Sequence, residues 1–241
     1  MTDPLSCFRA DALNEVPHGF FGRFSGDDGT QGGMTRYRQA VCEALLPGGK
    51  LVLLRQVHSA SCIAAEQPWS YPERPEGDAL VTDRPGIILG IVTADCAPVL
   101  LADPQAGVIG AAHAGWRGAL RGVLENTVAA MERLGAVSGR ITAAIGPAIA
   151  QTSYEVDESF RAAFPPETEH FFVRGRKEHW QFDLPGYVAD RLRRLGIDQV
   201  ESLALDTYTH PAQLHSYRRA THRGEERSGR QISVIALPFE P

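Results

Sequence analysis

Runs of apolar residues along the chain predict a series of short strands. Val, Ile, Leu and Phe dominate these runs and turn-forming residues separate them, as is typical of strands. We expect strands over residues 18–24, 50–58, 107–113, 140–146 and 230–237. The longest apolar stretch, residues 86–102, contains Pro98, which is unfavourable inside a central strand. We therefore expect one strand that ends near Cys96, a second that resumes after Pro98, and a hairpin turn over residues 102–107.

Three segments carry apolar residues at helical spacing, and we expect helices over residues 35–49, 118–135 and 183–196. The second segment places Leu120, Val123, Leu124, Thr127, Val128, Met131 and Leu134 on one face. Gly135 is expected to end this helix, whereas Asp183 is a candidate N-cap for the third, with Gly196 as its stop. Strands come in runs and helices come singly. This pattern predicts an α+β protein with a mixed sheet.

The chain of 241 residues has no internal repeat, low-complexity tract or long linker. The three prolines within residues 66–78 predict a surface loop, and a second loop begins at Pro165. Neither loop marks a domain boundary, because motif residues lie on both sides of each. We expect residues 1–241 to form a single compact domain with mixed β-sheet layers and a few flanking helices.

The composition excludes several classes of partner. A net charge of -5 argues against a nucleic-acid surface, which normally needs a basic field. No apolar run approaches the ~20 residues that a membrane span requires, and the N-terminal sequence does not resemble a secretory signal. We therefore expect a cytoplasmic protein without a membrane or nucleic-acid partner. In that reducing compartment its four cysteines should be thiols.

Three candidate metal ligands lie at the ends of predicted strands: His58, Cys96 and His113. Imidazole and thiolate ligands suit zinc or copper, and do not suit magnesium or calcium. Three protein ligands leave one position for water or substrate, which is typical of catalytic zinc. Water bound to such a zinc ion can lose a proton near neutral pH.

The residue types alone also allow two other interpretations. Cys96 could be a buried, inert thiol with His58 and His113 as satisfied strand-end histidines. Alternatively, Cys96 and His113 could form a nucleophile–base pair that Asp95 orients. Asp95 and Cys96 point to opposite faces of a strand unless the strand breaks there. The nearby Pro98 favours such a break, so Asp95 could reach the site.

Arg117 precedes a predicted helix N-terminus, where backbone N–H groups and the helix dipole favour an anion. It is a candidate for phosphate or carboxylate binding, or it stacks on Trp116 or pairs with a carboxylate. Arg218 and Arg219 are adjacent, so in an extended segment at most one of them enters a site.

Gln56 lies on the same strand face as His58. It either hydrogen-bonds a base or sugar or is a buried amide that the backbone satisfies. Asp78 is either a carboxylate that supports a metal ligand or a turn former after Gly77. The residue pattern leaves both choices open.

Several longer stretches carry a family resemblance. They are QVHSA (56–60), GDALVT (77–82), TADCAPVLLADP (93–104), HAGWRGAL (113–120), AIGPAI (144–149), SYEV (153–156) and SYRR (216–219). On these stretches the chain resembles the bacterial laccase-domain family. Its members were first called polyphenol oxidases and were later described as purine nucleoside phosphorylases with adenosine deaminase activity.

The resemblance implies a zinc ion held by His58, Cys96 and His113, with purine nucleosides and phosphate as substrates. Arg117 would then hold the phosphate, and Asp95 is a candidate for the carboxylate that moves protons during deamination. Gln56 and Arg218 are candidate substrate-binding residues.

The chain departs from the family near its C-terminal end. Asp206 stands where the family often has Cys, and the segment after SYRR is longer and carries His222. We expect these changes to alter one wall of the pocket, and with it the substrate preference, without touching the metal ligands.

Three rival functions remain at this level. The first is a cysteine hydrolase with Cys96 as nucleophile and His113 as base, acting on an amide such as a cell-wall precursor. The second is a polyphenol oxidase. The eight histidines include no HxH pair, which excludes a multicopper architecture, although a single Cu²⁺ fits the same ligands. The third is a binding module without catalytic activity.

Overall fold

The computed structural model describes residues 5–24 and 31–239, and two large β-sheets dominate it. The first sheet contains, in spatial order, β1 (Leu5–Phe8), β2 (His18–Phe24), β14 (Gln231–Ala236), β6 (Ile87–Thr93) and β3 (Lys50–Val52). The second contains β13 (Gln199–Ser202), β9 (Thr142–Ile145), β7 (Ala97–Asp103), β8 (Val108–Ala114), β5 (Ala79–Thr82) and β4 (Cys62–Ala64). Both sheets mix parallel and antiparallel pairs, as predicted for an α+β protein.

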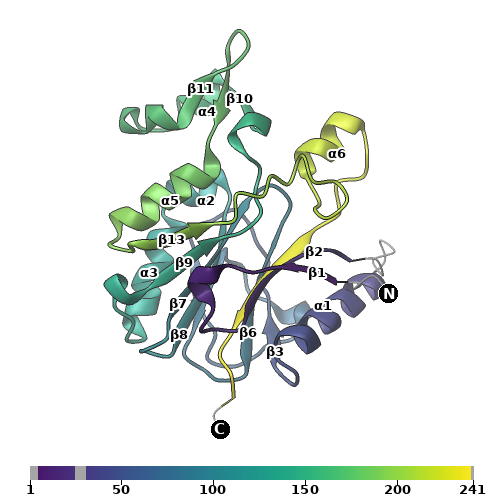
Figure 1. The fold of residues 1–241 in the computed structure, drawn as a ribbon, viewed down its shortest axis with the longest axis vertical. Helices are drawn as coiled ribbons and strands as arrows, with labels where there is room; N and C mark the ends of the chain where they lie inside the picture. The colour runs from purple at the N-terminus through teal and green to yellow at the C-terminus, as the bar shows by residue number, and fades with distance from the viewer. Residues whose placement is uncertain (1–4, 25–30, 240–241) are drawn as a thin grey trace.

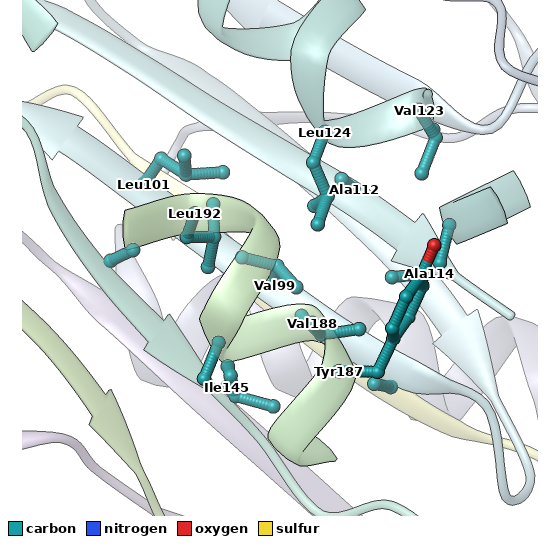
Figure 2. Packing of buried hydrophobic residues seen from close by; sticks show 14 of the residues in the cluster. Val99, Leu101, Ala112, Ala114, Val123, Leu124, Ile145, Tyr187, Val188 and Leu192 are labelled. Carbon is teal, nitrogen blue, oxygen red and sulfur yellow. The ribbon is translucent and has the colours of Figure 1, made fainter. Parts of the chain in front are cut away.

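Helices cover the outer faces of the two sheets (Figure 1). Helix α1 (Gln31–Leu45) packs on the first sheet, and α3 (Val123–Arg133) and α5 (Leu184–Arg194) pack on the second. Successive side chains of β7 point to opposite faces of the sheet, so this strand contributes to two hydrophobic cores. Val99 and Leu101 face the helices (Figure 2), whereas Leu100 packs in the core between the sheets. The resulting order of layers is helix, sheet, sheet and helices.

A small third sheet stands at one end of the molecule, beside α6 (Tyr217–Arg223) (Figure 1). It consists of β10 (Glu155–Asp157), β12 (His179–Phe182) and β11 (Phe172–Arg174), with α4 (Glu158–Arg161) beside it. The apolar pattern of the sequence did not predict these short elements. Aromatic rings hold the sheet in place: Phe160, Phe164 and Phe182 contact one another, and Phe160 lies 4.5 Å from Trp116 between ring centroids.

The predicted break in the longest apolar stretch is confirmed. Strand β6 ends at Thr93 and β7 begins at Ala97, one residue before Pro98, so the second strand starts slightly earlier than predicted. Pro98 is opposite His113 in the β7–β8 hairpin. The amide of His113 donates to Asp78 O, away from β7, at 2.7 Å. The ladder therefore requires no N–H from Pro98 at this point.

Three predicted elements are wrong in extent. The helix predicted over residues 35–49 is α1, which begins at Gln31 and ends at Leu45. The strand predicted over residues 50–58 is limited to Lys50–Val52. The helix predicted over residues 118–135 is two helices, α2 (Trp116–Arg121) and α3, because Gly122 at φ 95° interrupts it. The N-cap prediction for the third helix is confirmed, since the Asp183 side chain accepts from Gly186 N at 2.9 Å. Within the described residues, no helix is both long enough and apolar enough to cross a bilayer.

Candidate metal centre

The strand pairing in the second sheet brings the candidate ligands together at one end of β7 and β8. Pro98 is opposite His113 on neighbouring strands, so Cys96 lies just beyond the start of β7 at the end of β8. Ala79 is opposite Ala112, which places Asp78 beside His113. The segment after β3 supplies His58 to the same place.

The three predicted metal ligands lie together. The ligand atoms of His58, Cys96 and His113 are all within 4.8 Å of one another, and Cys96 Sγ is 3.9 Å from His58 Nε2. The two imidazole rings are 4.8 Å apart between centroids and inclined at 74°. His113 is buried, Cys96 is half-buried and His58 is exposed. The cluster therefore opens to the outside on the side of His58.

Asp78 holds the residues of this cluster in place through hydrogen bonds. Its Oδ1 accepts from His113 Nδ1 at 2.8 Å and from His58 N at 3.0 Å. Its Oδ2 accepts from Ser59 N and Ser59 Oγ at 2.6 and 2.7 Å, and from Val57 N at 3.2 Å. Because Nδ1 of His113 donates to the carboxylate, Nε2 is left to face the cluster. The sequence left open whether Asp78 supports a candidate ligand or only forms a turn. Its hydrogen bonds orient His113 and the loop that carries His58, so it supports both residues.

The backbone at the cluster is unusual at two residues. His58 has φ 58° and Asp95 has φ 87°, in the left-handed region that side chains rarely adopt. Gly115 also approaches closely: a Cβ at this position would lie 2.9 Å from Cys96 Sγ and 3.1 Å from His58 Cδ2. Strained backbone of this kind concentrates at functional sites.

The charges of the cluster support one another. Burial raises the pKa of the Cys96 thiol, but the neighbouring His113 and His58 outweigh it and lower that pKa to about 6. Burial lowers the pKa of His113, but the Cys96 thiolate and Asp78 raise it to about 9. Burial also opposes ionisation of Asp78, yet hydrogen bonds from His113 and Ser59 bring its pKa down to about 2. Without a metal ion, the site favours a thiolate beside an imidazolium.

The donor set fits a zinc or copper ion. Two imidazole nitrogens and one thiolate are the borderline and soft ligands that these ions take. The hydrogen bond from His113 to a carboxylate is the support that metal-bound histidines usually have. The partial exposure of the cluster leaves room for a further ligand.

Asp95 lies beside the cluster but is held by its neighbours. Its Oδ1 accepts from Thr207 Oγ1 at 2.6 Å, and its Oδ2 accepts from Arg218 N at 2.6 Å. Its carbonyl oxygen accepts from Ile149 N at 2.9 Å. The carboxylate thereby ties the turn before Cys96 to the start of α6. Its role as a proton carrier stays a prediction.

A cavity of about 780 Å³ adjoins the cluster, and its walls include Gln56, Arg117 and Arg218. Arg117 stacks over Trp116 at 4.4 Å, and Arg218 stacks over Tyr154 at 5.3 Å. Arg218 also donates to Glu155 O at 2.8 Å. These stacked guanidinium groups keep donors available at the cavity wall.

Gln56 uses its amide on the backbone. Its Nε2 donates to Val92 O at 2.8 Å, and its Oε1 accepts from Val92 N at 2.9 Å. One N–H and one lone pair of the amide are left for a ligand. Arg219, which follows Arg218 in the first turn of α6, is buried and donates to the carbonyls of Thr207, Tyr208 and Leu214. Only Arg218 of the pair lines the cavity, although the segment is helical and not extended.

The sequence did not single out several other cavity residues. They are Arg38, Tyr71, Arg74, Tyr154, Tyr217 and Arg230. Burial raises the pKa of Tyr154, and the Cys96 thiolate adds to this effect, so its hydroxyl stays protonated. Of the C-terminal departures, Asp206 and His222 do not line the cavity, whereas Arg230 from the same segment does. Tyr154 and Tyr217 lie in the quoted SYEV and SYRR stretches, but the other four come from segments outside the quoted stretches.

Comparison with known proteins identifies the family. A model described as multi-copper polyphenol oxidoreductase laccase matches residues 21–238. The chain belongs to this laccase family. The family resemblance drawn from the sequence is therefore confirmed.

Relatives in this family carry a different functional name. Proteins named purine nucleoside phosphorylase from Rickettsia conorii and Corynebacterium glutamicum are 38% and 34% identical over 191 and 235 residues. The first match covers 78% of each chain, and the second covers 96% of this chain and 93% of the relative. A crystal structure from Neisseria meningitidis matches with a TM-score of 0.85 and 28% identity, covering 98% of this chain and all of the other. A second, from Geobacillus stearothermophilus, has a TM-score of 0.86 at 24% identity, covers 99% of this chain and 97% of the other, and supports the fold alone.

Proposed function

We propose that this protein is a zinc-dependent purine nucleoside phosphorylase that also deaminates adenosine. The observation that carries the proposal is the cluster of His58, Cys96 and His113, whose ligand atoms lie within 4.8 Å beside a cavity lined with arginines. The names of the relatives agree with the phosphorylase activity. Zinc and deamination rest on the donor set and on the family resemblance.

In phosphorolysis, an oxygen of inorganic phosphate attacks C1′ of the ribose while the bond from C1′ to the purine breaks. The products are ribose 1-phosphate and the free base, which takes up a proton. Arg117 and Arg218 are positioned to hold the phosphate by charge-assisted hydrogen bonds. The protonated hydroxyl of Tyr154 can donate a further hydrogen bond to an anion at this wall.

In deamination, water replaces the amino group at C6 of adenine and ammonia leaves. Zinc bound at the cluster would supply Lewis acidity that lowers the pKa of water. Asp78 would keep His113 in the tautomer that offers Nε2. A carboxylate must move protons between water and the leaving amine. Asp95 is the candidate because it lines the cavity, and acting in this way would require it to release its hydrogen bonds with Thr207 and Arg218.

The first test measures metal content and products together. Protein purified without added zinc should contain about one zinc ion per chain and convert inosine with phosphate into hypoxanthine and ribose 1-phosphate. His113→Ala should lose both zinc and turnover, whereas His170→Ala, an exposed histidine outside the cavity, should keep both. If the zinc-loaded protein turned over no nucleoside, the proposal would fail.

A cysteine hydrolase is the second candidate, because the pKa of Cys96 is lowered beside His113. A thiolate that binds metal cannot attack a substrate as well. After chelation at pH 7.5, iodoacetamide should label Cys96 but spare Cys62, whose pKa burial raises to about 12. Labelling of Cys96 should slow as the pH falls through about 6 and stop when zinc is restored. Alkylation that removes an amidase activity from metal-free protein would favour the hydrolase.

Copper is the alternative metal for the same ligands. Elemental analysis of the purified protein, with activity measured after reconstitution with each metal, distinguishes the two ions.

No disulfide forms among the four cysteines, which all lie in the described residues. We extend the proposal to a cytoplasmic location, which rests on the expectation drawn from the sequence.

A further inference from the structure

The cavity beside the metal centre is far more cationic than the whole chain, whose net charge is -5. Among the residues that the structure describes, its charged walls, apart from the histidines, are six arginines and one carboxylate: Arg38, Arg55, Arg74, Arg117, Arg218, Arg230 and Asp95. Arg55 pairs with Glu76 at 2.6 Å. The other five arginines form no ion pair within residues 5–24 and 31–239. Such a wall indicates a ligand with more than one anionic group.

Two of these arginines enclose Tyr71. The guanidinium carbons of Arg38 and Arg74 lie 3.6 and 3.7 Å from the centroid of its ring. Both cannot lie on one face at these distances, so they occupy opposite faces. The two charges are therefore held roughly 7 Å apart across the ring. An anion that binds at the edge of this stack reduces their mutual repulsion.

The stack can present donors to one phosphoryl group. A guanidinium group that lies flat on a ring keeps its N–H groups in the plane, available at the edge. Arg38 Nε is buried without a hydrogen-bond partner among the described residues, and Arg74 uses one nitrogen on Tyr71 O at 2.8 Å. Each of the two guanidinium groups therefore has N–H donors left for an anion at the edge of the stack.

The loop that carries Tyr71 and Arg74 is well anchored. This is the segment of residues 66–78 that the three prolines predicted as a surface loop. Trp69 Nε1 donates to Leu53 O at 2.8 Å, and Arg55 N donates to Pro75 O at 2.9 Å. A loop fixed in this way loses little conformational entropy when it binds a ligand.

The stack lies away from the metal ligands along the cavity. A second pocket is lined by Arg117 and Arg218 but not by Arg38, Tyr71 or Arg74. Arg55, which is bonded to the loop, precedes His58 by three residues. Gln56 lies between them and lines the same cavity. Arg117 and Arg218 contact the other side, near Tyr154. The cavity thus offers two separate places for anions.

We infer that the Arg38–Tyr71–Arg74 stack binds the 5′-phosphate of a purine nucleotide. The inference rests on the proposed function, which supplies the purine nucleoside, and extends its substrate class to nucleoside 5′-monophosphates. The inorganic phosphate of phosphorolysis goes to Arg117 and Arg218 at the other wall.

The test compares binding of inosine and inosine 5′-monophosphate to zinc-loaded protein by calorimetry. Inorganic phosphate is omitted, so neither ligand is phosphorolysed, and inosine has no amino group to lose. Wild-type protein should bind the monophosphate at least tenfold more tightly. Arg38→Gln and Arg74→Gln should each bring this ratio toward one. Arg84→Gln, which removes an exposed arginine paired only with Asp83, should retain it.

Equal affinity of the wild-type protein for the two ligands would overturn the inference, as would an unchanged ratio in both cavity variants. The stack could also bind only free inorganic phosphate. In that case, Arg38→Gln would abolish the heat of phosphate binding, but the wild-type protein would show no preference for inosine 5′-monophosphate over inosine. This result would also overturn the inference. Circular dichroism and melting curves confirm that each variant folds. If inosine and phosphate gave no products while the monophosphate preference held, the proposed function would fail and the nucleotide site would stand.

Discussion

Asp78 has no exposed surface and accepts five hydrogen bonds. Three come from consecutive backbone N–H groups, so the carboxylate determines the path of the chain through residues 57–59 as well as the tautomer of His113. Its low pKa, about 2, follows from these bonds, which outweigh the effect of burial. One side chain therefore places two of the three proposed ligands.

Asp78→Asn should weaken zinc binding 10- to 100-fold, which is the usual effect of removing such a support. An amide cannot accept five hydrogen bonds, and its NH₂ group opposes the donors around it. The zinc dissociation constant is measured by competition with a chromophoric chelator.

Asp103→Asn is the matched control. Asp103 is also fully buried, lies at the opposite end of β7, and accepts from Val137 N at 2.9 Å and from Arg140. This variant should unfold more easily but bind zinc as the wild type does. Equal zinc affinity in Asp78→Asn and wild-type protein would show that the carboxylate does not support the site.

The sequence could single out the three candidate ligands because His and Cys are residue types that bind zinc or copper, and because the family resemblance implies them. It could not assign Asp78, since an Asp after Gly77 also suits an ordinary turn. Three other arginines of the cavity could not be predicted, for another reason. Arg38, Arg74 and Arg230 come from three distant segments, and only tertiary packing brings them to one wall.

At the scale of elements, the turn between β6 and β7 is joined to α6 through Asp95. Asp95→Asn is compatible with the positive φ and removes the charge that accepts from Arg218 N and Thr207. If Asp95 positions the turn, phosphorolysis of inosine and deamination of adenosine should fall in parallel. Thr207→Val, which removes the hydroxyl donor, should have a smaller effect of the same kind. Selective loss of deamination in Asp95→Asn would instead assign the proton-carrying role to this residue.

The predicted elements were wrong where tertiary contacts outweighed the local preference of the sequence for a strand or a helix. Residues 53–58 are apolar enough for a strand, but the side chain of Gln56 takes the hydrogen bonds of Val92 that a neighbouring strand would use. The apolar stripe of residues 118–135 continues through Gly122, so periodicity could not show the break. Within the two large sheets, the strands β2, β6, β7, β8, β9 and β14 were easier to predict, because short continuous apolar runs between turn residues are typical of strands buried on both faces. The sequence did not predict β1, β4, β5 and β13.

Gly122→Ala tests whether the break between α2 and α3 depends on glycine. At φ 95° an alanine is strained, and we expect a loss of about 1–2 kcal/mol in the free energy of unfolding. Gly139→Ala is the control, since it lacks a positive φ and a Cβ there contacts nothing within 4 Å; its stability should stay close to wild type. Urea denaturation of both variants gives the comparison, and equal stability would contradict the expectation.

On the scale of the whole molecule, the metal cluster lies where β8, β7, β5 and the segment after β3 meet. The ligands are 38 and 17 residues apart in sequence, so the folded arrangement of the layers creates the site and the unfolded chain lacks it. A metal that binds only the folded form stabilises it in proportion to RT ln(1 + [L]/Kd).

Zinc at 100 times its dissociation constant should therefore stabilise the fold by about 2.7 kcal/mol. For a domain of this size, this corresponds to a rise of roughly 5–10 °C in Tm. Cys96→Ala removes a proposed ligand and should abolish most of the rise. Cys62→Ala removes a thiol on β4 that burial keeps protonated, with a pKa of about 12. This variant should show the full zinc-induced rise in Tm, measured from the Tm of the same variant without zinc. Calorimetric scans with and without zinc measure both, and an equal shift in the two variants would place zinc binding elsewhere on the protein.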